Sequence, residues 1–189
     1  TDDLAEIFRH RVDYADLYFQ YSRSEGWSLE EGIVKSGSYS IDQGVGVRAV
    51  TGDKTAFAYS DAIGLEPLLE AARATRTIAR RGAGRVRLAG RFEAGAARRL
   101  YGDNDPIQTL DAAAKVALLE RVEKRARAAD PRIRQVMAGL AAEHDTILVA
   151  RSDGLIAGDV RPLVRLSVTV IAEQGGRREQ GHGGGGGRF

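Results

Sequence analysis

Hydrophobic and polar residues alternate strictly near the start of the chain. The apolar positions are Ala15, Leu17, Phe19 and Tyr21, and the polar positions between and after them are Asp16, Tyr18, Gln20 and Ser22. A period of two is typical of a β-strand with one buried face. We expect an antiparallel partner for this strand at residues 27–35, across a turn at Ser24-Glu25-Gly26.

A hairpin is predicted further along, where Gly52 and Asp53 supply a turn between two apolar runs. The second of these runs carries Phe57 and Tyr59. We therefore expect strands throughout residues 13–60.

Helical spacing replaces this alternation in two later segments. Leucine and alanine recur at helical intervals over residues 64–81, and Pro67 stands where a first-turn proline is tolerated. A second helix is predicted over residues 109–130, with Thr109 as its N-cap and Asp130-Pro131 as its end. Its expected buried stripe consists of Leu110, Ala114, Leu118, Val122, Ala126 and Ala129.

Strands return over residues 132–172, with a turn at Asp153-Gly154. Val164, Leu166, Val168 and Val170 alternate there with polar residues, which favours an antiparallel sheet with one solvent-exposed face. The order of strands, two helices and strands predicts an α+β fold, a largely antiparallel sheet with two main helices packed on one face. Residues 1–175 are expected to form one domain, followed by a glycine-rich segment at residues 176–189.

Positive charge is concentrated in one part of the chain, although the net charge is only +2. Between Arg73 and Arg99 there are nine arginines and one acid, Glu93. Such a stretch can bind nucleic acid, in which case binding weakens steeply with salt. It can equally be a solvated loop, and it carries neither an aromatic stacking platform nor a nucleic-acid motif. We therefore expect no nucleic-acid partner, and no membrane partner either, because no apolar run approaches the ~18 residues of a membrane span.

The local motifs contain no catalytic or metal-binding constellation. His10, His144 and His182 are far apart in sequence and cysteine is absent, whereas a catalytic zinc ion takes three protein ligands. Gly44 and Gly46 do not fit a nucleotide-binding loop, because they lie within a strand pattern that no helix follows. Two interpretations stay open for them, a bulge that bends the sheet or a place where an extended substrate peptide approaches the backbone.

Several long strings of the sequence resemble one known family. Residues 11–61 include RVDYADLYFQYS and IDQGVGVRA, residues 147–170 include DVRPLVRLSV, and the last residues are GGGGRF. In this order they resemble the TldD side of the TldD/PmbA family of zinc metallopeptidases. The resemblance implies a cytoplasmic peptidase that acts on unfolded or modified peptides as a heterodimer with a PmbA/TldE-like subunit.

The zinc motif of that family, H-E-x-x-x-H, and its distal cysteine follow the GGGGRF segment, and this chain contains neither. The resemblance therefore implies an N-terminal, non-catalytic portion that contributes to the substrate chamber and the heterodimer interface. We expect no catalytic residue, metal ligand or bound zinc in this chain, with zinc in the parent protein. Residues 176–189 would lead to the absent catalytic domain, with residues 183–187 disordered or held by a neighbour. The alternative is a stand-alone peptide- or partner-binding module without a hydrolytic role.

Overall fold

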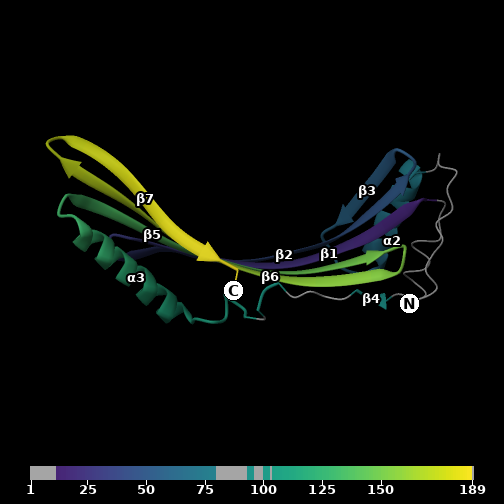
Figure 1. Ribbon diagram of the computed structural model, residues 1–189, viewed down its shortest axis with the longest axis horizontal. Coiled ribbons are helices and arrows are strands. Elements are labelled where there is room, and N and C mark those ends of the chain that lie inside the picture. Colours follow the sequence, from purple (N-terminus) through teal and green to yellow (C-terminus); the bar gives the residue numbers. More distant parts are fainter. Residues whose placement is uncertain (1–11, 80–92, 96–99, 103, 189) are drawn as a thin grey trace. The chain divides into compact units, whose positions relative to one another are not determined.

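The computed structural model describes residues 12–79, 93–95, 100–102 and 104–188, and strands make up most of it (Figure 1). The strands are β1 Tyr14–Glu30, β2 Ile33–Thr51, β3 Lys54–Ser60, β4 Glu93–Ala94, β5 Ile133–Arg151, β6 Leu155–Gln174 and β7 Arg177–Gly187. The described helices are α2 Leu65–Ala79 and α3 Ala112–Ala129.

These strands form a seven-stranded sheet. Its order is β3-β2-β1-β5-β6-β4, and β7 pairs with β6 outside this path. The β2–β3 and β6–β7 pairs are antiparallel, whereas β4 runs parallel to β6 over two residue pairs. The sheet is therefore mostly antiparallel, with a short parallel addition.

The expected α+β fold, with two main helices packed on one face of the sheet, is wrong. The fold is 61% strand and only 19% helix, so the sheet dominates the architecture. The four long strands β1, β2, β5 and β6 have 17, 19, 19 and 20 residues, far more than the alternating runs predicted. The two helices also belong to different compact units of the chain, each with its own core.

The long strands arise because β1 and β2 continue through segments that suggest turns. The expected turn at Ser24-Glu25-Gly26 is part of β1, and the chain turns instead at Glu31 and Gly32, whose φ angles are 53° and 72°. Ser24 Oγ lies 2.7 Å from Ser40 Oγ on β2. Small hydroxyl side chains can pair across strands, so a serine-rich segment does not have to end a strand.

The hairpin predicted at Gly52-Asp53 is confirmed. Gly52 has a φ of 58°, and β2 pairs with β3 in an uninterrupted register from Val45↔Ser60 to Thr51↔Lys54. Glycine adopts this left-handed conformation without the steric cost that a side chain brings. The turn at Asp153-Gly154 is likewise confirmed, since Gly154 has a φ of 93° between β5 and β6.

Unit 1 comprises Thr1–Ser22, Asp42–Arg99 and Thr146–Val160. Its core brings together apolar side chains from β1, β2, β5 and α2, and α2 contacts β3 extensively. The buried members of this core are Val12, Ala15, Leu17, Val45, Val47, Ala49, Leu68, Ala71, Ala72 and Ala150. The apolar side of the alternation in β1 thus packs towards α2, which leaves Asp16 and Tyr18 on the opposite face of the strand.

Unit 2 comprises Arg23–Ile41, Leu100–Asp145 and Arg161–Phe189. Its core lies between α3 and the sheet and contains Leu29, Leu119, Ala138 and Leu140, with Trp27, Leu118, Val122, Val164 and Leu166 packed against it. In Figure 1, α3 lies alongside the β5 part of this unit.

The start and the buried face of α3 differ from the sequence prediction. Asp111, not Thr109, is the N-cap, and its Oδ1 accepts the Ala114 N–H at 2.7 Å. The buried residues of the helix are Lys115, Leu119 and Glu123, so the buried face is rotated from the predicted stripe. Amphipathic spacing could not show this, because Lys115 and Glu123 are charged residues, and each is buried together with an ion-pair partner, Glu25 and Arg127 respectively.

The five consecutive glycines at residues 183–187 form the C-terminal part of β7, which pairs with β6 from Val164↔Gly187 to Gln174↔Arg177. A Cβ at Gly184 or Gly186 would collide with a carbonyl oxygen of β6, whereas a Cβ at Gly183 or Gly185 would meet open space. Of the two expected outcomes, residues 183–187 are therefore held by a neighbouring strand.

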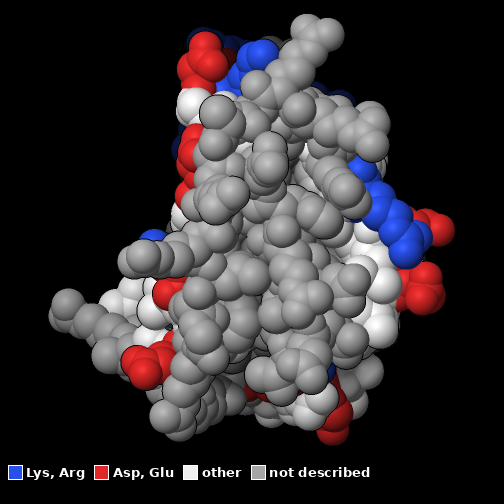
Figure 2. Space-filling view, turned by 90° about the vertical axis from the view of Figure 1, so that its right-hand side faces the viewer, with Lys and Arg blue, Asp and Glu red and all other residues white. Residues whose placement is uncertain are grey.

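The arginine-rich stretch between Arg73 and Arg99 lies largely outside the described residues. The expectation that the chain has no nucleic-acid partner therefore stays a prediction. On the face in Figure 2, the described acidic and basic side chains are interspersed. Within the described ranges, α2 and α3 are both too short or too polar to cross a membrane. The domain limits at residues 1–175 and 176–189 stay a prediction.

Candidate functional site

Gly44 and Gly46, the candidate residues from the sequence, line a groove in unit 1. This aromatic groove, of about 330 Å³, is lined by Tyr18, Gln20, Ser22, Asp42, Gln43, Gly44, Val45, Gly46, Phe57, Tyr59, Ser60 and Asp61. Its walls come from β1, β2 and β3. The β2–β3 register sets Gly46 opposite Tyr59, on the sheet face away from the apolar core.

Contacts within the hairpin account for both glycines. A Cβ at Gly46 would lie 2.8 Å from Cε2 of the Phe57 ring, and a Cβ at Gly44 would lie 2.9 Å from the Ser60 carbonyl oxygen. The continuous register at Gly46 also shows that it is not part of a bulge. The glycines thus admit the chain's own β3, and contact of a substrate with Gly44 and Gly46 stays a prediction.

Exposed aromatic rings form the apolar part of the groove. Tyr18, Phe57 and Tyr59 are all exposed, with 79% of Tyr59 accessible to solvent. The Phe57 and Tyr59 rings stack with centroids 6.3 Å apart and an interplanar angle of 23°. Aromatic faces of this kind bind apolar groups and, through their quadrupoles, cations.

The charged side chains that line the groove are the carboxylates of Asp42 and Asp61, so the groove carries negative charge. Within the described part of the chain, neither the Asp42 nor the Asp61 carboxylate forms a hydrogen bond or ion pair, and both residues line the groove. Arg48 stands opposite Phe57, but its Nε donates to Asp16 Oδ2 at 2.8 Å. Two unpaired carboxylates beside aromatic rings favour a ligand that carries positive charge and flat or apolar groups.

Arg48 also belongs to a stacked cluster on the same sheet face. Its guanidinium and that of Arg151 each lie 5.7 Å from the centroid of the Tyr14 ring. Burial and the neighbouring Asp16 carboxylate raise the pKa of Tyr14. Because both arginines have acidic partners, Asp16 and Asp153, this cluster is an internally neutralised support for β1 and β2.

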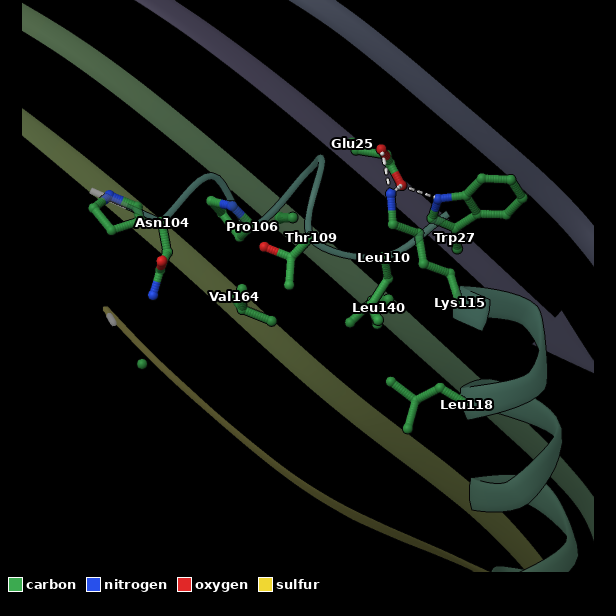
Figure 3. Close-up of a pocket in the computed structure, with 13 residues that line it drawn as sticks. Glu25, Trp27, Asn104, Pro106, Thr109, Leu110, Lys115, Leu118, Leu140 and Val164 are labelled. Atoms are coloured by element: carbon green, nitrogen blue, oxygen red, sulfur yellow. Dashed lines mark hydrogen bonds and ion pairs between the residues drawn. The ribbon is translucent and has the colours of Figure 1, made fainter. Parts of the chain in front are cut away.

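Unit 2 contains a second cavity, the apolar pocket, of about 220 Å³ (Figure 3). It is lined by Glu25, Trp27, Asn104, Pro106, Thr109, Leu110, Lys115, Leu118, Leu140, Ala142, Pro162, Val164 and Gly187. Lys115 Nζ lies 2.7 Å from Glu25 Oε1 and donates a hydrogen bond to the Ile107 carbonyl oxygen at 2.7 Å. Trp27 Nε1 donates to the same Glu25 carboxylate.

The polar atoms of Lys115, Glu25 and Trp27 thus satisfy one another in the wall of the apolar pocket. The remaining lining is mostly aliphatic, so the pocket suits an uncharged apolar group. Sequence reasoning missed this pocket because its walls come from distant segments. The one available signal is the period of two that sets Glu25 and Trp27 on the same face of β1.

The described residues do not fit a metal site. No three histidine, aspartate or glutamate side chains in the described ranges lie close enough together to hold an ion. His144 Nδ1 accepts a hydrogen bond from Arg23 Nη2 at 3.1 Å, and His10 lies outside the described residues. Glu143 and Asp145 form a carboxyl pair on β5, where the hydrogen bond between the two side chains and burial raise the pKa of Glu143.

Comparisons with known proteins point to one family across most of the chain. The PmbA/TldA metallopeptidase domain 1 matches residues 15–79, and the PmbA/TldA metallopeptidase central domain matches residues 105–189. A Haemophilus influenzae protein named Metalloprotease TldD homolog is 45% identical over 188 residues, which are 99% of this chain and 39% of that protein. A protein of the same name from Buchnera aphidicola subsp. Schizaphis graminum is 40% identical over 185 residues, 98% of this chain and 38% of that protein.

Solved structures share the fold at low sequence identity. A candidate modulator of DNA gyrase from Bacteroides thetaiotaomicron superposes with a TM-score of 0.76 at 15% identity, covering 97% of this chain and 43% of that one. TldE from Thermococcus kodakarensis gives a TM-score of 0.68 at 17% identity, covering 98% and 41%.

The chain thus spans about two fifths of the length of the curated relatives, 39% and 38% in the two cases above. The two domain models and these near-complete alignments agree with each other and with the resemblance of the sequence strings. The chain belongs to the TldD/PmbA metallopeptidase family.

Proposed function

We propose that this chain is the N-terminal, non-catalytic portion of a TldD-like zinc metallopeptidase that processes unfolded or modified peptides in the cytoplasm. In this role it contributes to the substrate chamber and to the contact with a PmbA/TldE-like subunit. Support comes from the relatives, which are named metalloproteases, and from the fold shared with TldE. In the parent protein the zinc would activate water and polarise the scissile carbonyl.

One observation carries the part assigned to this chain, namely the aromatic groove. The stacked rings of Phe57 and Tyr59 line it together with Gly44 and Gly46, and the unpaired carboxylates of Asp42 and Asp61 line it as well. Aromatic stacking tolerates many side chains, which suits an enzyme whose peptides differ in sequence. We assign the groove to binding a flexible segment of the peptide, with Gly44 and Gly46 in its lining.

The experiment measures cleavage of an unstructured peptide that contains lysine and arginine by the full-length protein with its partner subunit. Tyr59→Ala and Phe57→Ala should each raise KM about fivefold or more, the equivalent of about 1 kcal/mol of lost ring contact. The kcat should stay close to wild type, because neither ring belongs to the metal-bearing region. The control is Leu148→Ala, which truncates an exposed side chain of unit 1 outside the groove.

Charge provides a second readout. The double variant Asp42→Asn and Asp61→Asn should reduce the preference for a basic peptide over a neutral one, and raised salt should reduce it in the wild-type protein. Unchanged KM values for the ring variants, with every peptide, would remove the groove from the substrate path.

The alternative function is a peptide- or partner-binding module without a hydrolytic role. It predicts that the full-length protein with its partner and added zinc binds the peptide through the groove and leaves it intact. Mass spectrometry of the peptide after incubation separates the two functions.

A further inference from the structure

The apolar pocket of unit 2 has a buried interior and an exposed mouth. Among its lining residues, Leu140 is 8% exposed and Pro162 is fully buried. Leu110, by contrast, is 40% exposed, and Asn104 and Thr109 are exposed as well. These last three residues belong to the segment before α3, which therefore forms the mouth of the pocket.

The charges in the wall of the pocket neutralise one another. Lys115 and Glu25 are the only charged residues among those that line it. Lys115 Nζ lies 2.7 Å from Glu25 Oε1, and Figure 3 shows dashed lines from Lys115 and Trp27 to the same carboxylate. A further charge brought into the pocket would lose its hydration without gaining a partner, so the pocket disfavours charged groups.

The volume of the pocket sets the size of the group that it can hold. At about 220 Å³ it exceeds the roughly 150 Å³ of an apolar cavity that binds benzene. One branched aliphatic side chain or one benzene-sized ring therefore fits, whereas a methyl group would leave most of the space empty. Because the stabilisation grows with the apolar area that is buried, the pocket favours leucine or phenylalanine over alanine.

Asn104 supplies a polar contact at the mouth. Within the part of the chain that the structure describes, its carboxamide has no hydrogen-bond partner, whereas the Thr109 hydroxyl donates to the Asp105 carbonyl oxygen at 2.7 Å. A carboxamide offers a C=O acceptor and an NH₂ donor, which match the N–H and C=O groups of a peptide backbone. A peptide therefore satisfies both the interior and the mouth, whereas a free hydrocarbon or a lipid tail satisfies only the interior.

We propose that the apolar pocket binds one uncharged, bulky apolar side chain of a peptide, of the size of leucine or phenylalanine, while the Asn104 carboxamide hydrogen-bonds the peptide backbone beside it. The inference rests on the proposed function, because that function supplies the peptide. It adds a selection by the size of an apolar residue, whereas the carboxylates of the aromatic groove select for positive charge.

Equilibrium binding to the full-length protein with its partner subunit tests this preference. The probes are three fluorescently labelled peptides of glycine and serine that differ at one central residue, which is leucine, alanine or lysine. A chelator is present, so that binding is measured without cleavage. Fluorescence anisotropy should show that the leucine peptide binds at least about tenfold more tightly than the alanine peptide, as expected when methyl groups enter an apolar pocket.

Substitutions at two exposed positions test the two parts of the site. Leu110→Trp places a larger side chain in the mouth and should weaken binding of the leucine peptide to the level of the alanine peptide, with no effect on the lysine peptide. Asn104→Ala should weaken the leucine and alanine peptides by the same factor, about threefold or more, because it removes a backbone hydrogen bond. Leu100→Trp and Gln108→Ala, at exposed residues of unit 2 outside the pocket, are the matched controls.

Equal affinities for the leucine and alanine peptides, or a leucine preference that survives Leu110→Trp, would overturn the proposal. Toluene binding that Leu110→Trp abolishes, without any leucine preference, would assign the pocket to free hydrocarbons and would overturn it as well. Failure of the proposed function gives a different result. In that case the leucine preference remains, but the peptides stay intact when zinc is restored.

Discussion

Lys115 is a charged side chain that lies almost entirely out of water. It is 6% exposed, its partner Glu25 is 11% exposed, and their ion pair forms one wall of the apolar pocket. The remaining donor capacity of Lys115 goes to the Ile107 carbonyl oxygen. A charge buried in this way is stable only while its partner is present, because desolvation without compensation is costly.

Breaking the pair on one side should therefore cost more than removing both charges. We predict that Lys115→Met lowers the free energy of unfolding by about 3 kcal/mol, because it leaves the Glu25 carboxylate buried and unpaired. The double variant with Glu25→Gln should recover part of this loss. The measurement is urea unfolding, and Lys124→Met, on the exposed side of α3, is the control. Equal small effects at both lysines would show that the pair does not stabilise this wall.

At the scale of elements, the end of α3 is fixed by one residue pair. Asp130 is the C-cap, and its Oδ1 accepts hydrogen bonds from the Arg132 backbone N–H at 2.8 Å and from Arg132 Nε at 2.9 Å. The Arg132 side chain, followed by its backbone N–H, lowers the pKa of Asp130 to about 2 from the ordinary 3.8. Because the Asp130–Arg132 ion pair is exposed to solvent, it adds little to the stability of the protein, and its main effect is to fix where α3 ends.

This pair gives a pH prediction with a defined sign. The carboxylate is favoured in the folded state, so its contribution to stability is present above pH 3.8 and is lost as the pH falls towards 2. Carboxyl NMR titration should find the lowered pKa of Asp130 in the wild-type chain. Arg132→Gln should raise that pKa towards its ordinary value, and an unchanged titration would show that Arg132 is not the cause.

The same scale shows what the sequence could predict about the fold. The hairpin at Gly52 and the turn at Gly154 followed from local residue chemistry, because a glycine with positive φ has few alternatives. Strand length could not be predicted, because serine side chains that indicate a turn instead pair across β1 and β2. The predicted helical stripe was right in part, since Leu118 and Val122 pack against the core. It missed Lys115, whose ion-pair partner lies 90 residues away in sequence.

For the candidate site too, local residue chemistry predicted some features, and others depend on contacts between distant parts of the chain. Gly44 and Gly46 could be singled out from sequence, since glycine inside a strand indicates close approach. The approaching group, the Phe57 ring of the paired strand, becomes visible only with the register of the hairpin. The apolar pocket as a whole could not be predicted, because Trp27, Lys115 and Val164 come from β1, α3 and β6.

For the whole molecule, the structure has two compact units, and two family models match the chain. Unit 1 and unit 2 each contain a part of β1, β2, β5 and β6, so each of these long strands contributes to both units. The family models instead divide the chain by sequence, at residues 15–79 and 105–189. Neither part contains a group of three potential metal-ligating side chains within the described ranges.

The most direct test of this account is zinc content measured per mole of protein, in this 189-residue chain and in the full-length protein, together with cleavage of an unstructured peptide. We predict about one equivalent of zinc and peptide cleavage for the full-length protein with its partner, as expected of a single catalytic site. The isolated chain should retain no stoichiometric zinc after dialysis and should leave the peptide intact. One tightly bound equivalent of zinc on the isolated chain would contradict the account, because the metal site would then lie within these residues.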